Sequence, residues 1–363
     1  MPKKEKVAVG LSGGVDSAVA AALLKKDGYD VTGVFLLTQN GIDAKDVKNI
    51  CAELDIPLEI IDARKRFQKE VVGYFLKEYS AGRTPNPCVF CNENFKFKLL
   101  FEAAEKLGAD YVSTGHYVRI KQEIRNPNIE IRNKSKIINS KLKKSYKLFS
   151  AKDKNKDQSY FLYRIGQKEL ARLIFPLGEY EKTEVRELAR KFKLPVQDKA
   201  ESQDVCFLAG MTTEKFLEKN IKSKKGKIVD EQGEVLGEHR GLPLYTLGQR
   251  KGINIGGTGP YYVLGKNCEK NILIVTNDKR QLPLLAKTAI LEQTVFPAGL
   301  PVFPAKVLIR TRYRNPLSYA IIKPDLTRKY IVEFEKPQRA VTPGQSCVFY
   351  SEDGSLIGGG IIK

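Results

Sequence analysis

A short run of glycine and hydroxyl residues near the N-terminus has the residue types and spacing needed to hold phosphate. It reads Ser12-Gly13-Gly14-Val15-Asp16-Ser17, and it lies between a strand-like and a helix-like segment. Because glycine has no Cβ, the backbone N–H groups of Gly13 and Gly14 can turn inward around an anion at the helix start. The run lacks the Gly-Lys-Ser/Thr ending of a Walker A loop, which disfavours a kinase or a GTPase. An ordinary turn that caps a helix is the structural alternative.

Three of the six cysteines lie in loop motifs that could carry thiol chemistry. Cys88 and Cys91 form a CxxC pair in the segment GRTPNPCVFCN, which we expect to be a proline-rigid turn after a helix, and Cys206 lies in ESQDVCF. A CxxC pair can bind zinc, carry redox chemistry or hold a cluster. Zinc usually takes a second pair of ligands, so a structural zinc site is disfavoured. Three cysteines are expected to be small buried residues: Cys51, Cys268 and Cys347.

Alternating strand and helix patterns in the first half predict a parallel sheet covered by helices on both faces. The expected strands are residues 7–11, 30–37, 58–62 and 111–114, and the expected helices are residues 17–26, 44–54, 67–79, 94–107 and 182–192. Ligands of such sheets lie beyond the C-terminal ends of the strands. The glycine loop, Leu36 and Gly115 would all meet there.

The length of 363 residues and the changes in composition predict three domains. An α/β domain at residues 1–212 carries an insertion at residues 119–147, which holds ten Lys+Arg against two Asp+Glu and is expected to be a hairpin or loop that is solvated or contacts RNA. A small central domain at residues 213–281 starts with a basic hairpin. Short alternating runs at residues 282–363 predict an all-β barrel.

The charge balance indicates a polyanionic partner. The chain has 62 Lys+Arg against 42 Asp+Glu, a net charge of +20, so nucleic acid is the first partner to consider and a lysine-rich solvated surface is the alternative. No apolar stretch approaches the roughly 20 residues of a membrane helix, and no signal peptide is recognised. We therefore expect a cytoplasmic protein without membrane contact and without a structural disulfide framework.

Eight motifs are spread over almost the whole chain: SGGVDS, GRTPNPCVFCN, STGHY, NKDQSYFL, ESQDVCF, LGQRKG, RYRN and RAVTPGQSCVFY. They occur in the order seen in the bacterial tRNA-specific 2-thiouridylases, a family of PP-loop ATP pyrophosphatases, which this chain resembles. The resemblance implies a PP-loop domain for adenylation and thiolation, a central tRNA-binding domain and a C-terminal β-barrel.

The resemblance also implies which residues bind ATP and tRNA. The ATP-binding residues would be Gly10, Leu11, Ser12, Gly13, Gly14, Val15, Asp16, Ser17, Leu36 and Gly115, with Asp16 a candidate for placing Mg²⁺. The target base would meet Asn86, Pro87 and Cys88, and the tRNA would meet His116, Lys156, Asp157, Gln158, Arg312, Tyr313 and Gln345. Without the resemblance, His116 would be interpreted as a structural histidine and Arg312 and Tyr313 as an ordinary strand pair.

The implied activity is ATP-dependent 2-thiolation of uridine at the wobble position of tRNA, U34. The C2 oxygen of uracil is a poor leaving group, and adenylation converts it into departing AMP. The resemblance implies that Cys206 accepts sulfur as a persulfide from a relay protein or a cysteine desulfurase. Cys91 would be the partner nucleophile and would end in a Cys91–Cys206 disulfide that must be reduced in each turnover.

One departure from the family pattern leaves two alternatives open. Many members carry Asp where this chain has Cys88, and three thiolates at Cys88, Cys91 and Cys206 could hold a [4Fe–4S] cluster with one open iron, which gives the same product by another route. No other metal site is predicted. A tRNA-binding protein without catalysis is the alternative from a different class, although binding alone would not need intact SGGVDS, Cys91 and Cys206.

Overall fold

The first unit of the computed structural model is a five-stranded parallel sheet. The structure describes residues 4–125, 143–200, 205–208, 210–256, 260–278, 285–327 and 329–363. The strand order is β3-β2-β1-β4-β7. The strands are β1 (Lys6–Gly10), β2 (Asp30–Leu37), β3 (Leu58–Asp62), β4 (Tyr111–Thr114) and β7 (Leu173–Ile174). The predicted α/β fold with a parallel sheet is therefore confirmed, and the short edge strand β7 is an addition to it.

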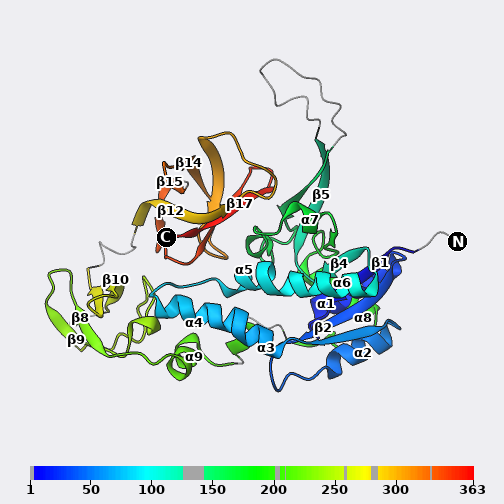
Figure 1. Ribbon diagram of the computed structural model, residues 1–363, viewed down its shortest axis with the longest axis horizontal. Coiled ribbons are helices and arrows are strands. Elements are labelled where there is room, and N and C mark those ends of the chain that lie inside the picture. The colour runs from blue at the N-terminus through cyan, green and yellow to red at the C-terminus, as the bar shows by residue number, and fades with distance from the viewer. Residues whose placement is uncertain are drawn as a thin grey trace, which may run out of the picture.

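Helices cover both faces of this sheet because its strands are apolar on both sides (Figure 1). Val7 and Val9 pack with α1 (Val15–Lys26), α2 (Lys45–Glu53) and α8 (Lys182–Lys191) on one face. Ala8 packs with α6 (Phe97–Leu107) on the other face. Successive side chains of a strand point to opposite faces, so β1 contributes to both apolar layers. In the strand order it is also the central strand of the sheet.

A long helical segment leads away from the parallel sheet (Figure 1). It consists of α3 (Arg64–Phe67), the π-helical turn η1 (Gln68–Val72) and α4 (Gly73–Ser80). After a turn the chain returns through α5 (Pro87–Cys91) and the π-helical turn η2 (Asn92–Lys96) into α6. The predicted turn around the CxxC pair is wrong, because Asn86 caps a short helix whose first residue is proline, a residue suited to that position.

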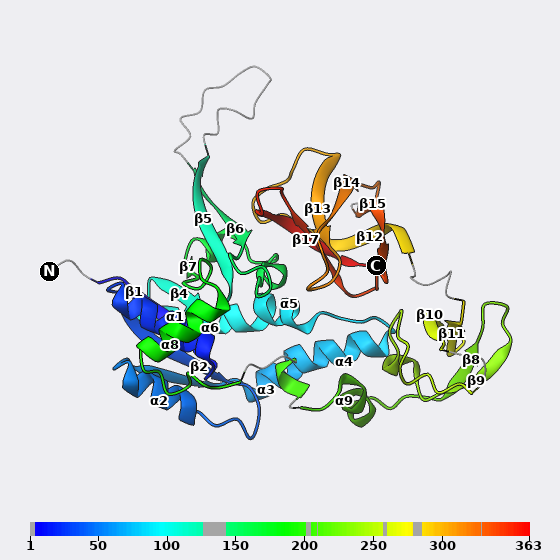
Figure 2. The same cartoon turned by 180° about the vertical axis from the view of Figure 1, so that it is seen from behind.

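The basic insertion begins and ends as an antiparallel ribbon. Strand β5 (Val118–Arg125) pairs with β6 (Lys143–Ser150) from Val118 opposite Ser150 to Arg125 opposite Lys143. Figure 2 shows the ribbon rising away from the parallel sheet. Residues 126–142 lie outside the described part of the chain. The hairpin expected for the insertion is confirmed at its base.

The middle unit contains a four-stranded sheet in the order β10-β11-β8-β9. It follows the short turn η5 (Cys206–Leu208) at the end of the first unit. Its elements are α9 (Thr213–Asn220), β8 (Gly226–Val229), β9 (Val235–His239), η6 (Leu242–Leu244), β10 (Tyr262–Asn267) and β11 (Ile272–Thr276). The basic hairpin expected here is β8 and β9, which pair antiparallel. Phe67 and Phe75 of the long helical segment share one core with Phe207 of η5 and Phe216 of this unit. The middle unit is thus packed onto the first through apolar side chains.

The C-terminal unit is a closed barrel of six strands in the order β12-β15-β14-β13-β16-β17, as the sequence predicts. The strands are β12 (Leu285–Val295), β13 (Ala305–Arg310), β14 (Ser318–Pro324), β15 (Tyr330–Arg339), β16 (Ser346–Tyr350) and β17 (Leu356–Ile362). Tyr350 packs with Tyr160 and Tyr163 of the first unit, and the Tyr160 hydroxyl donates to the Ser346 carbonyl at 2.9 Å. Among the helices that the structure describes, none is long and apolar enough to cross a membrane.

Candidate active site

The glycine loop is preorganised by its own serines. The Ser17 hydroxyl accepts from the Ser12 backbone N–H at 3.1 Å and donates to the Gly14 carbonyl at 3.1 Å. Gly13 has φ +72°, a conformation that favours glycine. Helix α1 starts after Gly14 without a side-chain cap, so its first N–H groups remain available to an anion. The predicted phosphate-binding loop therefore has the geometry that such a loop needs.

Two lysines that the sequence analysis did not single out lie at this loop. The Lys182 ammonium contacts Asp16 Oδ1 at 2.6 Å, and the Tyr117 hydroxyl donates to the same oxygen at 2.7 Å. The Lys199 ammonium donates to the Gly13 carbonyl at 2.9 Å and pairs with Asp46 at 2.5 Å. Both lysines follow the loop by more than 160 residues, so no local motif could reveal them. They bring positive charge to a loop that lacks the Walker lysine.

We expect Lys182→Met to weaken binding of a non-hydrolysable ATP analogue at least about tenfold, because Asp16 loses its cationic partner and the phosphates lose a cation. Isothermal titration calorimetry measures the effect. Lys191→Met is the matched control, since Lys191 is exposed at the end of the same helix α8. Equal affinities of the Lys182 variant and the control would contradict a role for Lys182 in nucleotide binding.

Gly115 fits against the backbone of the loop and helix. A Cβ on Gly115 would lie 2.6 Å from the Ser17 backbone nitrogen and 2.7 Å from the Asp16 carbonyl carbon. Leu36 lies two residues beyond Val34, which pairs with Gly10 of β1. The residues predicted for ATP thus gather at the C-terminal edge of the parallel sheet, where ligands of such sheets bind.

The three motif thiols come together beside this edge. Cys88 and Cys91 are half-buried on α5, and Cys206 is exposed at the start of η5. Phe207 anchors Cys206 through ring contacts with Phe75 at 5.0 Å and Phe67 at 6.1 Å. Residues 201–204 of the ESQDVCF motif lie outside the described residues.

The surroundings of the thiols hold them in the protonated form. Burial raises the pKa of Cys91 to about 12 and that of Cys88 to about 11, and the charge of Lys96 opposes both shifts. Burial also raises the pKa of Cys206, and the charge of Lys96 and backbone hydrogen bonds oppose this shift. Negative charge on Cys206 raises the pKa of both other thiols further. The three sulfurs are therefore electrostatically coupled.

The cysteines form neither a group of metal ligands nor a disulfide among the described residues. Over the part of the chain that the structure describes, no three His, Cys, Asp or Glu side chains gather as metal ligands. All six cysteines are free thiols; Cys51 and Cys347 are buried as expected. Cys268 is exposed, so its predicted burial is wrong: it follows strand β10 in a turn instead of lying within the strand.

The residues expected at the target base and the tRNA divide into two groups. Tyr313 of the C-terminal unit faces the first unit, since its ring lies 4.4 Å from the Phe161 ring. The Arg312 guanidinium donates to the Thr342 hydroxyl of its own unit, and its buried Nε has no hydrogen-bond partner among the described residues. The Tyr160 ring also lies 6.1 Å from the Tyr313 ring, and Asn86 caps α5 by accepting from the Val89 N–H at 3.4 Å.

The other group makes contacts within the protein. Asp157 is buried and accepts from the Ala151 and Ser159 N–H groups, both at 3.2 Å, and Gln158 accepts from the Tyr117 N–H at 2.9 Å. Lys156 forms the turn just before them, its N–H bonded to Asp153. In this structure, these side chains hold the chain beside the glycine loop.

Gln345 and His116 are likewise engaged internally. The Gln345 amide donates to the Thr84 carbonyl at 2.8 Å and to the Pro85 carbonyl at 3.2 Å, which fixes the segment before Asn86. His116 bonds the Thr114 hydroxyl at 2.7 Å and stacks on Phe97. Burial, with the charge of Lys96, holds the pKa of His116 well below its usual value, so the ring is neutral.

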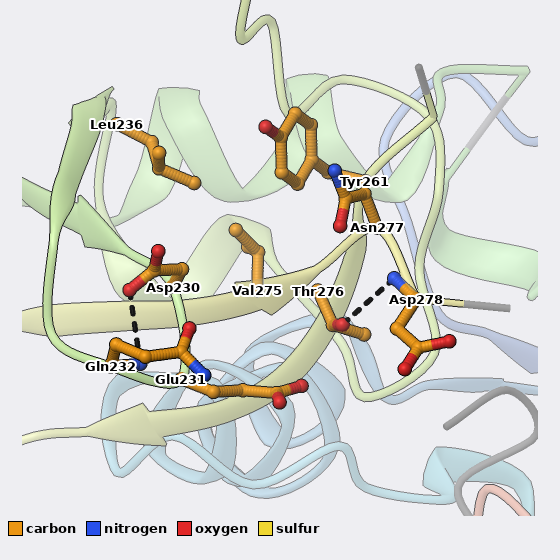
Figure 3. Close-up of a pocket in the computed structure, with 9 residues that line it drawn as sticks. All are labelled: Asp230, Glu231, Gln232, Leu236, Tyr261, Val275, Thr276, Asn277 and Asp278. Atoms are coloured by element: carbon orange, nitrogen blue, oxygen red, sulfur yellow. Dashed lines mark hydrogen bonds between the residues drawn. The ribbon is translucent and has the colours of Figure 1, made fainter. Parts of the chain in front are cut away.

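A pocket of about 500 Å³ lies elsewhere, in the middle unit (Figure 3). Its lining comes mostly from the β8–β9 turn and the end of β11: Asp230, Glu231, Gln232, Leu236, Tyr261, Val275, Thr276, Asn277 and Asp278. None of the residues predicted for ATP, thiol chemistry or tRNA lines it. The candidate active site is therefore the loop and thiol region, not this pocket.

A parallel sheet with a glycine loop between its central strand and α1, and with thiols beside its ligand-binding edge, defines an α/β nucleotide-binding protein of the PP-loop class. Comparison with models of known protein families assigns each part of the chain to a domain family. The model of the tRNA methyl transferase HUP domain matches residues 5–210, that of the tRNA methyl transferase PRC-barrel domain residues 214–277, and that of the aminomethyltransferase beta-barrel domain residues 288–362.

Individual relatives match over the full length. The tRNA-specific 2-thiouridylase MnmA of Syntrophomonas wolfei is 41% identical and covers 98% of this chain and 99% of its own length. That of Proteus mirabilis is 41% identical and covers 99% and 97%. Among solved structures, a 4-thiouridine synthetase–RNA complex with bound ATP is 19% identical, with a TM-score of 0.36 over 57% of this chain and 46% of that one. The chain belongs to the tRNA-specific 2-thiouridylase family.

Proposed function

We propose that this chain is an ATP-dependent tRNA sulfurtransferase that replaces the C2 oxygen of the wobble uridine, U34, with sulfur and converts ATP to AMP and pyrophosphate. The observation that carries the proposal is the placement of the coupled thiols beside the nucleotide edge of the sheet. Leu36, at that edge, packs against the same apolar core as Cys91 and Val205. A reaction that activates a base with ATP and then attacks it with sulfur needs both sites within reach of one nucleotide.

The glycine loop binds the phosphates of ATP in this proposal. The N–H groups at the start of α1 and the ammonium groups of Lys182 and Lys199 face the negative charge. Asp16 fits a role in holding Mg²⁺ together with phosphate oxygens, since oxygen donors are the ligands that Mg²⁺ prefers. Bound Mg²⁺ would neutralise phosphate charge during adenylation.

The thiols carry the sulfur. Cys206, the exposed thiol, receives sulfur as a persulfide from a relay protein. The terminal sulfur of the persulfide attacks the adenylated C2, the C–O bond breaks and AMP leaves. The Cys91 thiolate then attacks the Cys206 sulfur, which breaks the S–S bond and leaves sulfur on the uridine. A Cys91–Cys206 disulfide remains, and an external dithiol reduces it.

The tRNA is positioned by all three units. The domains at residues 1–212, 213–281 and 282–363 surround the segment before α5: Thr84 contacts Thr246 of the middle unit, and Gln345 of the barrel holds its carbonyl. In this proposal Arg312 and Tyr313 contact the tRNA, and Asn86, Pro87 and Cys88 meet the target base. The net charge of +20 attracts the tRNA backbone and makes binding salt-dependent.

AMP formation tests the adenylation step. We expect AMP and pyrophosphate to form when the protein, ATP and Mg²⁺ are mixed with unmodified tRNA that carries U34, and chromatography of the nucleotides measures both products. The same tRNA with cytidine at position 34 is the control. Equal AMP formation with both tRNAs, or none with either, would contradict the proposal.

A further inference from the structure

The C-terminal barrel holds the chain just before α5 (Pro87–Cys91), which we call the thiol helix because it carries two of the motif cysteines. The Thr84 N–H donates to a backbone carbonyl of the barrel at 2.9 Å. The Gln345 side-chain amide donates to the Thr84 carbonyl at 2.8 Å and to the Pro85 carbonyl at 3.2 Å. A Cβ on Gly344 would lie 2.9 Å from the Thr84 carbonyl oxygen. The two segments therefore touch through their backbones at this point.

The same barrel is linked to the other end of the thiol helix through Arg164. The π-helical turn η2 follows Cys91 directly, and the Glu93 carboxylate in it accepts from Arg164 Nε at 2.5 Å. Arg164 Nη1 donates to the Gln293 carbonyl of β12 at 2.9 Å. Only 13% of the Arg164 side chain is exposed, so solvent screens this ion pair less than a surface pair. One arginine thus joins the turn after the thiol helix to the barrel.

These contacts flank the two thiols closely. Pro85 lies three residues before Cys88, and Glu93 lies two residues after Cys91. Because neighbouring Cα atoms are a fixed distance apart, an anchor this near on each side restricts where the sulfur atoms can lie. The barrel that is expected to contact tRNA therefore also sets the position of the thiol helix.

We propose that Gln345 and Arg164 are positioning residues through which the barrel holds the thiol helix on both sides and places Cys91 for its attack on the Cys206 sulfur. This inference deepens the function proposed above and rests on it for the role of Cys91 in the reaction. Neither residue touches the reacting atoms, since both act through the backbone and the turn that flank the helix.

Alkylation of the cysteines in the full-length protein alone tests the inference. Iodoacetamide labelling followed by peptide mass spectrometry reports how often each buried thiol becomes accessible through local opening. Gln345→Leu removes two hydrogen bonds, and Arg164→Gln removes the ion pair. Each variant should raise the alkylation rate of Cys91 about tenfold at a fixed pH, because the helix opens more often. Cys51 and Cys347 should keep their wild-type rates, since these buried thiols report on the folding of the first unit and of the barrel.

Two variants of similar chemistry serve as matched controls. The Gln338 amide also donates two hydrogen bonds, at 3.0 and 2.8 Å, but both acceptors lie within the barrel. The Arg172 guanidinium bonds two backbone carbonyls within the first unit. Gln338→Leu and Arg172→Gln should therefore leave the Cys91 rate unchanged.

An unchanged Cys91 rate in Gln345→Leu or in Arg164→Gln would overturn the inference. An equal rise at Cys51 and Cys347 would also overturn it, because the contacts would then only stabilise the fold. Gln345→Glu, which keeps the shape but has no amide hydrogens, and Arg164→Met carry the test if the first variants do not fold.

The reaction gives a second readout. The two positioning variants should form AMP at the wild-type rate and make about tenfold less 2-thiouridine per AMP, whereas an equal loss of both products would contradict a positioning role. A wild-type protein that makes no 2-thiouridine would contradict the proposed function, and the alkylation rates would still decide whether the barrel holds the thiol helix.

Discussion

Cys206→Ser is expected to reduce 2-thiouridine formation by about a thousandfold or more, while AMP formation with U34 tRNA continues. A serine hydroxyl cannot carry a persulfide, so sulfur never reaches the activated base, and losing a covalent nucleophile typically costs this much or more. The glycine loop and its lysines do not depend on this side chain. Nucleoside mass spectrometry and AMP chromatography on the same samples measure the two steps separately.

Cys268→Ser is the matched control because Cys268 is also an exposed cysteine, but it lies in the middle unit outside the thiol group. Thiolation at the wild-type rate is expected for this variant. Undiminished 2-thiouridine formation by Cys206→Ser would show that sulfur travels by another route, and it would refute the role given to Cys206.

Gly115→Ala is expected to give the second large effect, a loss of about a hundredfold in the rate of AMP formation. The new methyl group would lie 2.6 Å from the Ser17 nitrogen, and its other close neighbours are also backbone atoms that cannot swing aside. The loop and the start of α1 must shift, and a misplacement of about 1 Å costs about 10²-fold in rate. Overpacking should also destabilise the fold by about 1–3 kcal/mol.

The matched control for this glycine is Gly237→Ala in β9. A Cβ there meets nothing within 4 Å, and the residue does not need the left-handed conformation that favours glycine. Its AMP formation and thermal unfolding should equal those of the wild type. Wild-type activity in Gly115→Ala would instead mean that the loop tolerates displacement and does not bind ATP in the proposed way.

The sequence predicted the parts of the fold whose signals are local. The strands 30–37, 58–62 and 111–114 were predicted at the bounds that the structure has, because apolar runs between turn residues fix them. The glycine loop was also predicted from a local signal, because glycine is the residue that favours the positive φ found at Gly13. The turn expected around Cys88 was wrong because the two prolines outweighed the Asn86 cap in the prediction.

The sequence predicted only part of the candidate site, because several of its residues are brought there by contacts between distant segments. Lys182 and Lys199 contact the glycine loop from distant segments, so no local sequence pattern could predict their place in the site. Asp157 and Gln345 were expected at the tRNA, but in this structure their polar atoms bond the protein itself, including the Thr84 carbonyl. Whether a polar residue faces a ligand or the backbone is decided by tertiary packing.

The most direct test of the proposed function is mass spectrometry of nucleosides from unmodified tRNA after anaerobic incubation with the protein, Mg²⁺, a cysteine desulfurase with cysteine as the persulfide donor, and a dithiol reductant, with and without ATP. We expect 2-thiouridine at position 34 only when ATP is present. Tight tRNA binding without any 2-thiouridine, or thiolation that does not depend on ATP, would contradict the function proposed for this chain.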